Sequence, residues 1–329
     1  MRHTMRMTAV AALGALAIAG CGGGSGGGGG AAGGGSGDGP TTLHVQETAG
    51  VPSAFVAFGM DKGFFAKQQL KIDLQSSQGG ATTVPALVSG KIQVAGSNVV
   101  SLLIAASKGL PVEAIAPGTS AHGSGKKDFG ALMVAKGSPI RDVKQLAGKT
   151  VAVNTLNNIA EVVVKASLQK SGVDPDQVKL REIDFPEMGP ALARHDVDAA
   201  FLIEPFVTIA RKAGNRIVDY SYVTTEPNLQ VGAYAVSRKF AEQNPDAVKR
   251  YRAAVGQTAT YLMAHQAEFR TFLAKQAKTP SALAKTMELP TFTTALNTAS
   301  MQHTAGLVQQ FGLVKDKVQV DDLTGGGGA

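Results

Sequence analysis

The sequence predicts an α/β protein built from two successive series of strands and helices. Short β-rich runs alternate with helical stretches from Thr41 onward, and this alternation is typical of a parallel sheet covered by helices. The first series ends near residue 116, and the second begins near residue 129. Two strands that cross between the series, 129–135 and 229–236, indicate two lobes and a hinge. A single large α/β domain is the alternative that the bare pattern leaves open.

In the first series, each element follows from local signals. Pro52 opens a helix through Val56 and Met60, and Gly63 stops it, because proline suits the first helical turn and glycine the position after the last. Residues 79–85 form a turn that leads into a helix ending near Gly90. The strands expected are 43–46, 70–74, 92–95 and 112–116, and the remaining helix is 99–108.

The second series repeats the alternation. Its expected strands are 129–135, 150–153, 178–183 and 199–203, and its expected helices are 143–146, 159–171 and 188–195. Residues 229–236 then run back as a strand. Asn244 caps and Pro245 opens a helix, and the rest of the chain is mainly helical to Leu313.

The composition narrows the class of function. Hydrophobic residues make up 44% and charged residues 17%, enough for a well-buried core. Without Arg2 and Arg6, in a segment expected to be removed, 30 basic residues face 25 acidic ones, a net charge of +5. The basic residues are scattered, so no nucleic-acid partner is expected. The six histidines form no metal-binding pair, and no GxSxG or Walker motif occurs, so we expect neither a metal, a cofactor nor an enzyme.

Residues 1–21 have the features of an export signal. A basic start precedes the apolar stretch 9–19, which is too short to span a bilayer as a mature helix. Ile18, Ala19 and Gly20 then lead to Cys21, the only cysteine of the chain. This junction resembles the lipobox of bacterial lipoproteins, whose cysteine is lipidated and becomes the new N-terminus. An ordinary signal peptide with a chance cysteine is the alternative.

The segment after Cys21 is nearly all glycine. Residues 22–40 have no apolar groups to bury, so we expect a flexible tether with a root-mean-square reach of about 25 Å. Residues 324–329 are expected to be a disordered tail.

Several segments along the chain resemble one known family. They are GFFAK at 63–67 followed by Leu70 and Ile72, PALVSGKIQVA at 85–95, GLPV at 109–112, SPI to LAGKTVAV within 138–153, HDVDAAFLIEP at 195–205, and FGL at 311–313 with 318–323. Their order and spacing resemble the binding proteins for nitrate, aliphatic sulfonates and taurine, and the related binders of thiamine-pyrimidine precursors. The resemblance covers nearly all of 43–323.

This resemblance implies a type II periplasmic-binding-protein-like fold, in which two α/β lobes joined by two crossing strands close on a ligand. The first lobe would be 41–129 with 230–323, and the second 130–229. The implied partners are a small-molecule ligand and the permease and ATPase subunits of an ABC transporter. Pyrimidine synthases that share the resemblance carry a Cys-rich motif, which this chain lacks.

Candidate ligand contacts follow from a general rule. In open α/β sheets, ligands bind beyond the carboxyl ends of strands, where helix N-termini offer free N–H groups and partial positive charge. The residues in such positions are Gly79, Gly80, Ala81 and Thr82; Ser97 and Asn98; Asn154, Thr155, Asn157 and Asn158; Glu204; and, as weaker candidates, Gln46 and Glu47.

Each candidate group has an alternative role. A turn with a helix cap would explain 79–82 as well as ligand contact does. At 97–98 a helix cap is the alternative, and ligand contact is slightly favoured. The four side chains at 154–158 exceed what capping requires, so ligand contact is favoured there. Glu204 could pair with an amine, bridge to the opposite lobe on closure, or be a solvated loop acid.

These observations together predict an exported protein, anchored through Cys21 to the outer face of the cytoplasmic membrane, that delivers a small anion to an ABC importer. A sulfonate, taurine or nitrate is the expected kind of ligand. The alternatives are a binder of a thiamine-pyrimidine-like heterocycle, an enzyme of the same fold, and a lipid-anchored sensor or adhesion module. The chain has no tryptophan, which disfavours a stacked ring, although Tyr and Phe can also stack.

Overall fold

The computed structural model describes residues 39–124, 127–276 and 280–325. The expected signal segment 1–21, Cys21, almost all of the tether 22–40 and most of the tail 324–329 lie outside these residues. The described residues belong to one compact unit that begins at Gly39.

The first sheet has the strand order β2-β1-β3-β11-β4. β1 runs parallel to both of its neighbours, whereas β11 is antiparallel to β3 and β4. Along β1, the buried side chains alternate with exposed or half-buried ones, and the buried set is Leu43, Val45 and Glu47. The bounds are β1 Thr41–Thr48, β2 Leu70–Ser77, β3 Val94–Asn98, β4 Val112–Pro117 and β11 Gly232–Ser237.

The second sheet has the order β10-β6-β9-β7-β8. β7 is parallel to β8 and β9, and β6 is antiparallel to β9 and β10. The bounds are β6 Gly130–Val134, β7 Thr150–Val153, β8 Lys179–Glu182, β9 Ala199–Ile203 and β10 Arg216–Asp219. A two-stranded ribbon pairs β5 (Thr119–Ser120) with β12 (Thr291–Phe292).

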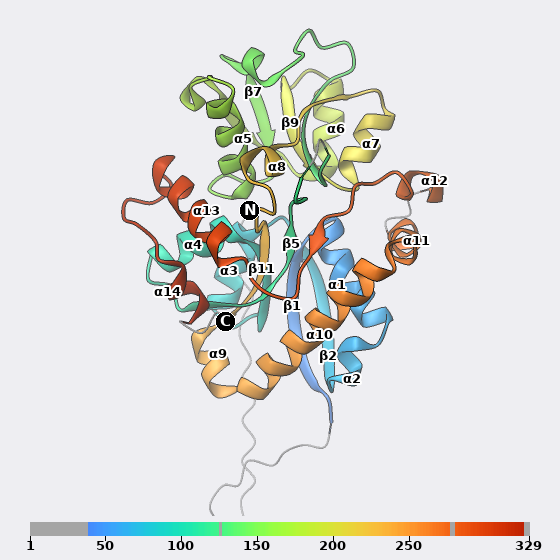
Figure 1. The fold of residues 1–329 in the computed structure, drawn as a ribbon, viewed down its shortest axis with the longest axis vertical. Coiled ribbons are helices and arrows are strands. Elements are labelled where there is room, and N and C mark those ends of the chain that lie inside the picture. The colour runs from blue at the N-terminus through green and yellow to red at the C-terminus, as the bar shows by residue number, and fades with distance from the viewer. Residues whose placement is uncertain (1–38, 125–126, 277–279, 326–329) are drawn as a thin grey trace, which may run out of the picture. The chain divides into compact units, whose positions relative to one another are not determined.

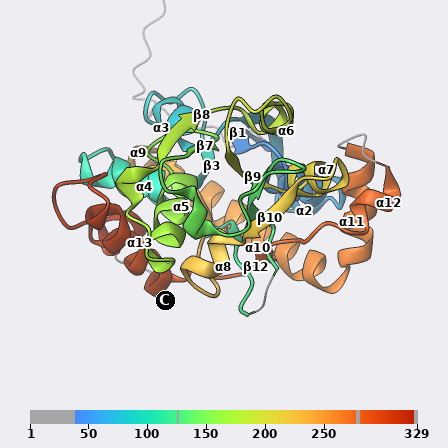
Figure 2. The same ribbon diagram turned by 90° about the horizontal axis from the view of Figure 1, so that it is seen from above.

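Helices cover both sheets. Figure 1 shows α5, α6 and α7 with the second sheet and α1, α2 and α10 with the first, and Figure 2 shows α5 on one side of the second sheet and α6 and α7 on the other. The bounds are α1 Val51–Asp61, α2 Phe64–Lys67, α3 Gly80–Val88, α4 Val99–Ser107, α5 Ile159–Lys170, α6 Phe185–Ala193, α7 Phe206–Lys212, α8 Ser221–Thr225, α9 Arg238–Gln243, α10 Pro245–Ala264, α11 Gln266–Gln276, α12 Ser281–Ala284, α13 Thr298–Gln310 and α14 Val320–Thr324, with 3₁₀ turns η1 Val143–Leu146 and η2 Pro175–Gln177.

The chain passes between the sheets twice. It leaves the first sheet after β4, passes through β5 of the ribbon, forms the second sheet with β6 to β10, and returns before β11. The segments expected to cross, 129–135 and 229–236, come directly after these two connections and contain β6 and β11. β6 pairs within the second sheet and β11 within the first. The lobe bounds 41–129, 230–323 and 130–229 stay a prediction.

Two local expectations differ from the structure around the first sheet. Residues 79–85 are not a turn: Gly79, with φ of 139°, turns the chain alone, and α3 begins at Gly80 with Pro85 inside it. β3 begins later than expected and includes Ser97 and Asn98, because these polar residues pair with β11. That pairing joins residues more than 130 positions apart, so no local pattern indicates it.

Other differences lie at helix starts. Pro245 opens α10 as expected, but the Asn244 side chain does not cap it and instead donates to the Phe240 carbonyl of α9. α6 begins at Phe185 rather than 188, with Pro186 in its first turn. Several elements of two to seven residues, such as β5, β12, α7 and α8, were not expected, because they are too short for periodicity to show.

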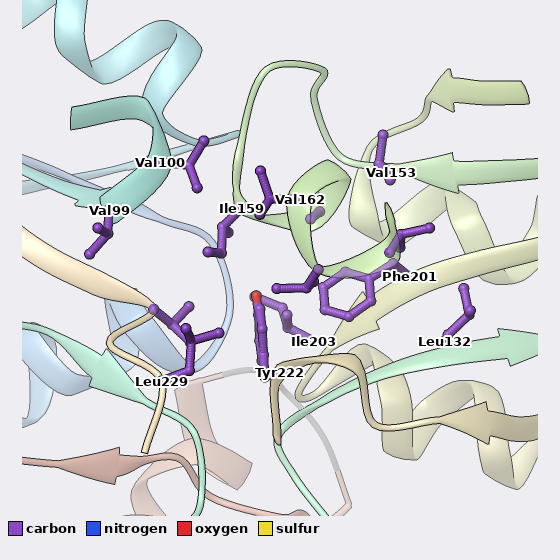
Figure 3. Packing of buried hydrophobic residues seen from close by; sticks show 14 of the residues in the cluster. Val99, Val100, Leu132, Val153, Ile159, Val162, Phe201, Ile203, Tyr222 and Leu229 are labelled. Atoms are coloured by element: carbon purple, nitrogen blue, oxygen red, sulfur yellow. The ribbon is translucent and has the colours of Figure 1, made fainter. Parts of the chain in front are cut away.

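Buried apolar side chains form two clusters. One fills the space between the first sheet and α1, α10 and α11. The other extends from α4 to α5 and the second sheet, and Figure 3 shows Val99 and Val100 of α4 near Ile159 of α5. The starts of α4 and α5 therefore lie close together. In the described part of the chain, no helix is long and apolar enough to cross a membrane.

Candidate functional site

A small cavity lies where residues from the two sheets meet. Its volume is about 40 Å³, which holds roughly three waters at about 10–15 Å³ each. The first sheet and its loops contribute Glu47, Thr48, Pro52, Gly79, Ser97, Asn98, Gly118, Thr119, Val231, Gly232, Ala233 and Tyr234; the second contributes Phe129, Asn154, Asn158, Ile159, Phe185, Ile203 and Tyr222. Among these described lining residues there is no Lys, Arg or His, and Glu47 is the single carboxylic acid.

The start of α3 lies against the end of β3. No side chain caps this helix, and the Gly79 carbonyl accepts hydrogen bonds from Thr82 N and Thr83 N at 3.1 and 3.2 Å. A Cβ on Gly80 would lie 2.2 Å from Ser101 Cβ and 2.6 Å from Ser97 Oγ, so only glycine fits there. Gly79 lines the cavity, whereas Ala81 and Thr82 are exposed and do not line it.

Asn98 joins the starts of two helices. Its Oδ1 accepts a hydrogen bond from Ser101 N at 2.9 Å, which caps α4, and another from Ile159 N at 3.2 Å, at the start of α5. The capping role expected as the alternative is therefore present. The same oxygen also connects the first sheet to the second, which the sequence did not indicate.

Asn154 and Asn158 form a chain of side-chain amides. Asn158 Oδ1 accepts from Ala160 N at 2.9 Å and so caps α5, and its Nδ2 donates to Asn154 Oδ1 at 3.0 Å and Thr155 Oγ1 at 2.6 Å. Asn154 Nδ2 donates to the Gln78 carbonyl of the first-sheet side at 2.8 Å. Asn157 is exposed and turns the chain with φ of 53°. Of the four side chains expected here, Asn154 and Asn158 line the cavity, and Thr155 and Asn157 do not.

Glu204 is a buried bridge, not a solvated loop acid, because it is only 1% exposed. Its carboxylate accepts hydrogen bonds from Thr208 N at 3.0 Å, Thr208 Oγ1 at 2.8 Å and Glu288 N at 3.2 Å. Its carbonyl accepts from Val51 N at 3.2 Å. Burial raises the pKa of Glu204 from 4.5 to about 7. Glu204 does not line the cavity, and among the roles expected for it the bridge fits its contacts.

Glu47 lies in the wall of the cavity although the sequence ranked it low. It is 5% exposed, and its Oε1 accepts a hydrogen bond from Thr48 N at 2.7 Å. Burial raises the pKa of Glu47 from 4.5 to about 7. Its neighbour Gln46 faces the other way and donates to Gln75 Oε1 at 3.3 Å, so Gln46 does not reach the cavity.

Four aromatic side chains of the cavity wall were missed from the sequence. They are Phe129, Phe185, Tyr222 and Tyr234. The rings of Phe129 and Tyr222 lie 4.9 Å apart, and Figure 3 shows Tyr222 among Ile159, Ile203 and Leu229. Burial raises the pKa of Tyr222, so its hydroxyl stays protonated. The four rings come from four separate segments, and no local motif connects them.

A family model described as NMT1/THI5 like matches residues 53–269, which is more than half of the chain. The chain belongs to the NMT1/THI5-like family.

Two relatives of this NMT1/THI5-like chain are described as binding proteins. The taurine-binding periplasmic protein of Escherichia coli is 28% identical over 191 residues, which are 58% of this chain and 57% of that protein. The putative binding protein YtlA of Bacillus subtilis is 23% identical over 211 residues, 63% of this chain and 61% of that protein. The chain thus aligns with less than two thirds of the length of either relative.

Solved structures show which fold the NMT1/THI5-like chain has. The alkanesulfonate-binding protein SsuA of Xanthomonas axonopodis pv. citri, bound to MOPS, superposes with a TM-score of 0.74 at 19% identity, covering 86% of this chain and 98% of that one. The periplasmic nitrate-binding protein NrtA of Synechocystis PCC 6803 superposes with a TM-score of 0.68 at 14% identity, covering 84% and 82%. The expected periplasmic-binding fold and the resemblance to the sulfonate, taurine and nitrate proteins are therefore confirmed.

Proposed function

We propose that this protein is an exported solute-binding protein that holds a small anionic solute, such as a sulfonate or nitrate, in the cavity between its two sheets. The observation that carries this proposal is the uncapped start of α3 at the cavity wall. The N–H groups at the start of a helix lack intrahelical partners and carry partial positive charge, so they receive an anion without a full cation. This suits a wall in which the described residues include no Lys or Arg.

Further polar groups support the proposal. The starts of α1, α4 and α5 also reach the cavity through Pro52, Asn98 and Asn158. Asn98 and Asn158 cap their own helices, and α1 and α3 have no side-chain cap. In α1, Val51 N donates to the Glu204 carbonyl and Pro52 has no N–H, so the first N–H groups of α3 are the ones left for a ligand. The Ser97 hydroxyl, beside Gly80, would add a neutral donor.

The cavity also bears on how a solute enters. At about 40 Å³ it suits a small inorganic or two-carbon anion better than a large one. Hydrogen bonds from Asn154 to Gln78, from Ile159 to Asn98 and from Glu288 to Glu204 join the two sides. Entry would require these contacts to open by a hinge motion, which would make the two lobes, 41–129 with 230–323 and 130–229, separate bodies.

A small heterocycle is the second candidate ligand. The four aromatic side chains Phe129, Phe185, Tyr222 and Tyr234 favour it, because aromatic faces can stack on a planar ring. Such a ring would need a wider opening of the cavity than an inorganic anion.

Delivery to an ABC permease and anchoring through Cys21 complete the proposal. The chain would be lipidated at Cys21, with the glycine-rich 22–40 as its tether. Cells fed labelled palmitate are expected to label the wild-type chain and not Cys21→Ser, and an unlabelled wild-type chain would contradict the anchor.

Calorimetry of the purified protein with ethanesulfonate, taurine, nitrate and an aminopyrimidine tests the ligand class. We expect saturable binding of at least one anion, and Ser97→Ala to weaken it about fivefold, the equivalent of one hydrogen bond of about 1 kcal/mol. The matched control is Ser89→Ala, because Ser89 lies exposed at the other end of α3. If only the aminopyrimidine binds, the ligand is a heterocycle and not an anion. If none of the four compounds binds saturably, both ligand classes are contradicted.

A further inference from the structure

The register of β1 brings one carboxylate to the cavity. Leu43, Val45 and Glu47 occupy alternate positions on the buried face of this strand, so Glu47 stands where the pattern places a core residue. Its carboxyl group is therefore held by a central strand of the sheet and not by a mobile loop. Among the described lining residues it is the only side chain that becomes anionic near neutral pH.

The neighbouring strands are shaped around this carboxyl group. Gly96 of β3 lies between Glu47 and Tyr234 of β11, and it pairs directly with Tyr234. A Cβ on Gly96 would lie 2.0 Å from Glu47 Oε2 and 2.3 Å from its Cδ, so a glycine is required there. The missing side chain leaves room for the Glu47 carboxyl group toward Tyr234, whose side chain lowers the pKa of Glu47 against the larger effect of burial.

No cation compensates this carboxylate within the described residues. The polar groups that interact electrostatically with Glu47 belong to Thr48 of β1, Tyr234 of β11 and Tyr251 of α10. Burial keeps both tyrosines neutral by raising their pKa values. A buried carboxylate without a counter-charge is costly, and a purely anionic ligand beside it would be repelled.

We propose that Glu47 is a specificity-determining residue that accepts a hydrogen bond from a protonated nitrogen of the solute, so that the cavity selects a zwitterion whose anionic end lies at the start of α3. This inference rests on the proposed function and names its substrate class. An amino-alkyl sulfonate satisfies both ends of such a site. A sulfonate with a hydroxyl in place of the ammonium group lacks the charge that Glu47 requires.

The proposal fixes the sign of a pH effect. The pKa of Glu47 in the free protein is about 7, and the ammonium binds the ionised form. Below pH 7, binding therefore requires Glu47 to lose a proton, and the dissociation constant rises up to tenfold for each pH unit. Above pH 7 it is constant as long as the ligand amine stays protonated. For an anion without an amine, the dissociation constant would instead fall as the pH falls, or would not change.

Calorimetry on the full chain with taurine and isethionate, two sulfonates that differ in the ammonium group, tests this inference. The wild-type protein is expected to bind taurine at least tenfold more tightly than isethionate at pH 7.5. Glu47→Gln is expected to reduce this preference below threefold and to abolish the pH slope between 5.5 and 7.5. Glu113→Gln is the matched control, because Glu113 belongs to the same sheet, on β4, and lies outside the cavity wall.

The outcomes separate the two proposals. Equal or tighter binding of isethionate by the wild-type protein overturns the role of Glu47 and leaves the proposed function intact. An unchanged preference for taurine in Glu47→Gln also overturns it. Binding of neither sulfonate nor any other small anion overturns the proposed function. If Glu47→Gln does not fold, the taurine–isethionate ratio and the pH slope of the wild-type protein decide.

Discussion

At the scale of single residues, the cavity wall depends on positions where no side chain is tolerated. Gly80 rests on Ser97 and Ser101, and Gly96 rests on the Glu47 carboxyl group. Neither glycine needs a positive φ, so both are required by close contact and not by backbone conformation. Such contacts join segments that are distant in the sequence.

Gly80→Ala is predicted to be destabilising. The added methyl group would overlap Ser101 Cβ at 2.2 Å and push α3 away from β3, at a cost of about 1–3 kcal/mol. Urea unfolding measures the stability change, and calorimetry should show weakened anion binding. Gly306→Ala, inside α13 with no atom within 4 Å of the new Cβ, is the control and should be neutral or stabilising. Equal effects of the two substitutions would contradict the packing argument.

At the scale of elements, helix starts carry the contacts between the two sheets. Asn98 is the last residue of β3, caps α4 and also accepts from the first N–H of α5. One side chain thus serves two helices, and its role as a cap and its place at the cavity are compatible. At Asn98, the capping role therefore does not exclude a ligand contact.

Substitutions of Asn98 separate its two roles. Asn98→Ala is predicted to lower the free energy of unfolding by about 1–2 kcal/mol, since α4 loses its cap and Ile159 N loses its acceptor. Asn98→Ser should recover part of this loss, because serine caps a helix but is too short to reach α5. Chemical denaturation of the three proteins checks the order, and a serine variant as unstable as the alanine variant would refute it.

At the scale of the whole molecule, three buried carboxyl groups link stability to pH. Burial raises the pKa values of Glu47, Asp128 and Glu204 to about 7. Because the folded protein holds these protons more tightly than the unfolded chain does, their stabilising contribution is complete below the unfolded pKa values near 4. It is lost as the pH rises through about 7.

The ligand-free protein is therefore predicted to become less stable between pH 4.5 and pH 7.5. Each group contributes up to about 3 kcal/mol, since one pKa unit corresponds to about 1.4 kcal/mol. Urea unfolding at fixed pH values measures the slope. Glu204→Gln, which keeps the shape but does not titrate, should make the slope shallower. A slope that is unchanged in this variant would show that Glu204 does not contribute.

Much of the element order could be predicted because its causes are local. β1 follows from alternation, β7 and β9 follow from short apolar runs, and α1 follows from proline at its start and glycine after its end. Six of the candidates chosen at strand ends lie in the cavity wall, namely Gly79, Ser97, Asn98, Asn154, Asn158 and Glu47. Short elements such as β12 and α8 could not be predicted, because they contain too few residues for a period.

By itself, the sequence determined the α/β class, the family resemblance and the polar strand ends, since each is written in residues a few positions apart. Only the tertiary structure decided that Glu47 faces the cavity and Gln46 does not, that Glu204 bridges to Glu288, and that four aromatic rings share one wall. The physical reason is that a polar side chain at a strand end can cap a helix, bridge to another segment or face a cavity. Which of these it does depends on strand pairing and packing between residues far apart in the chain.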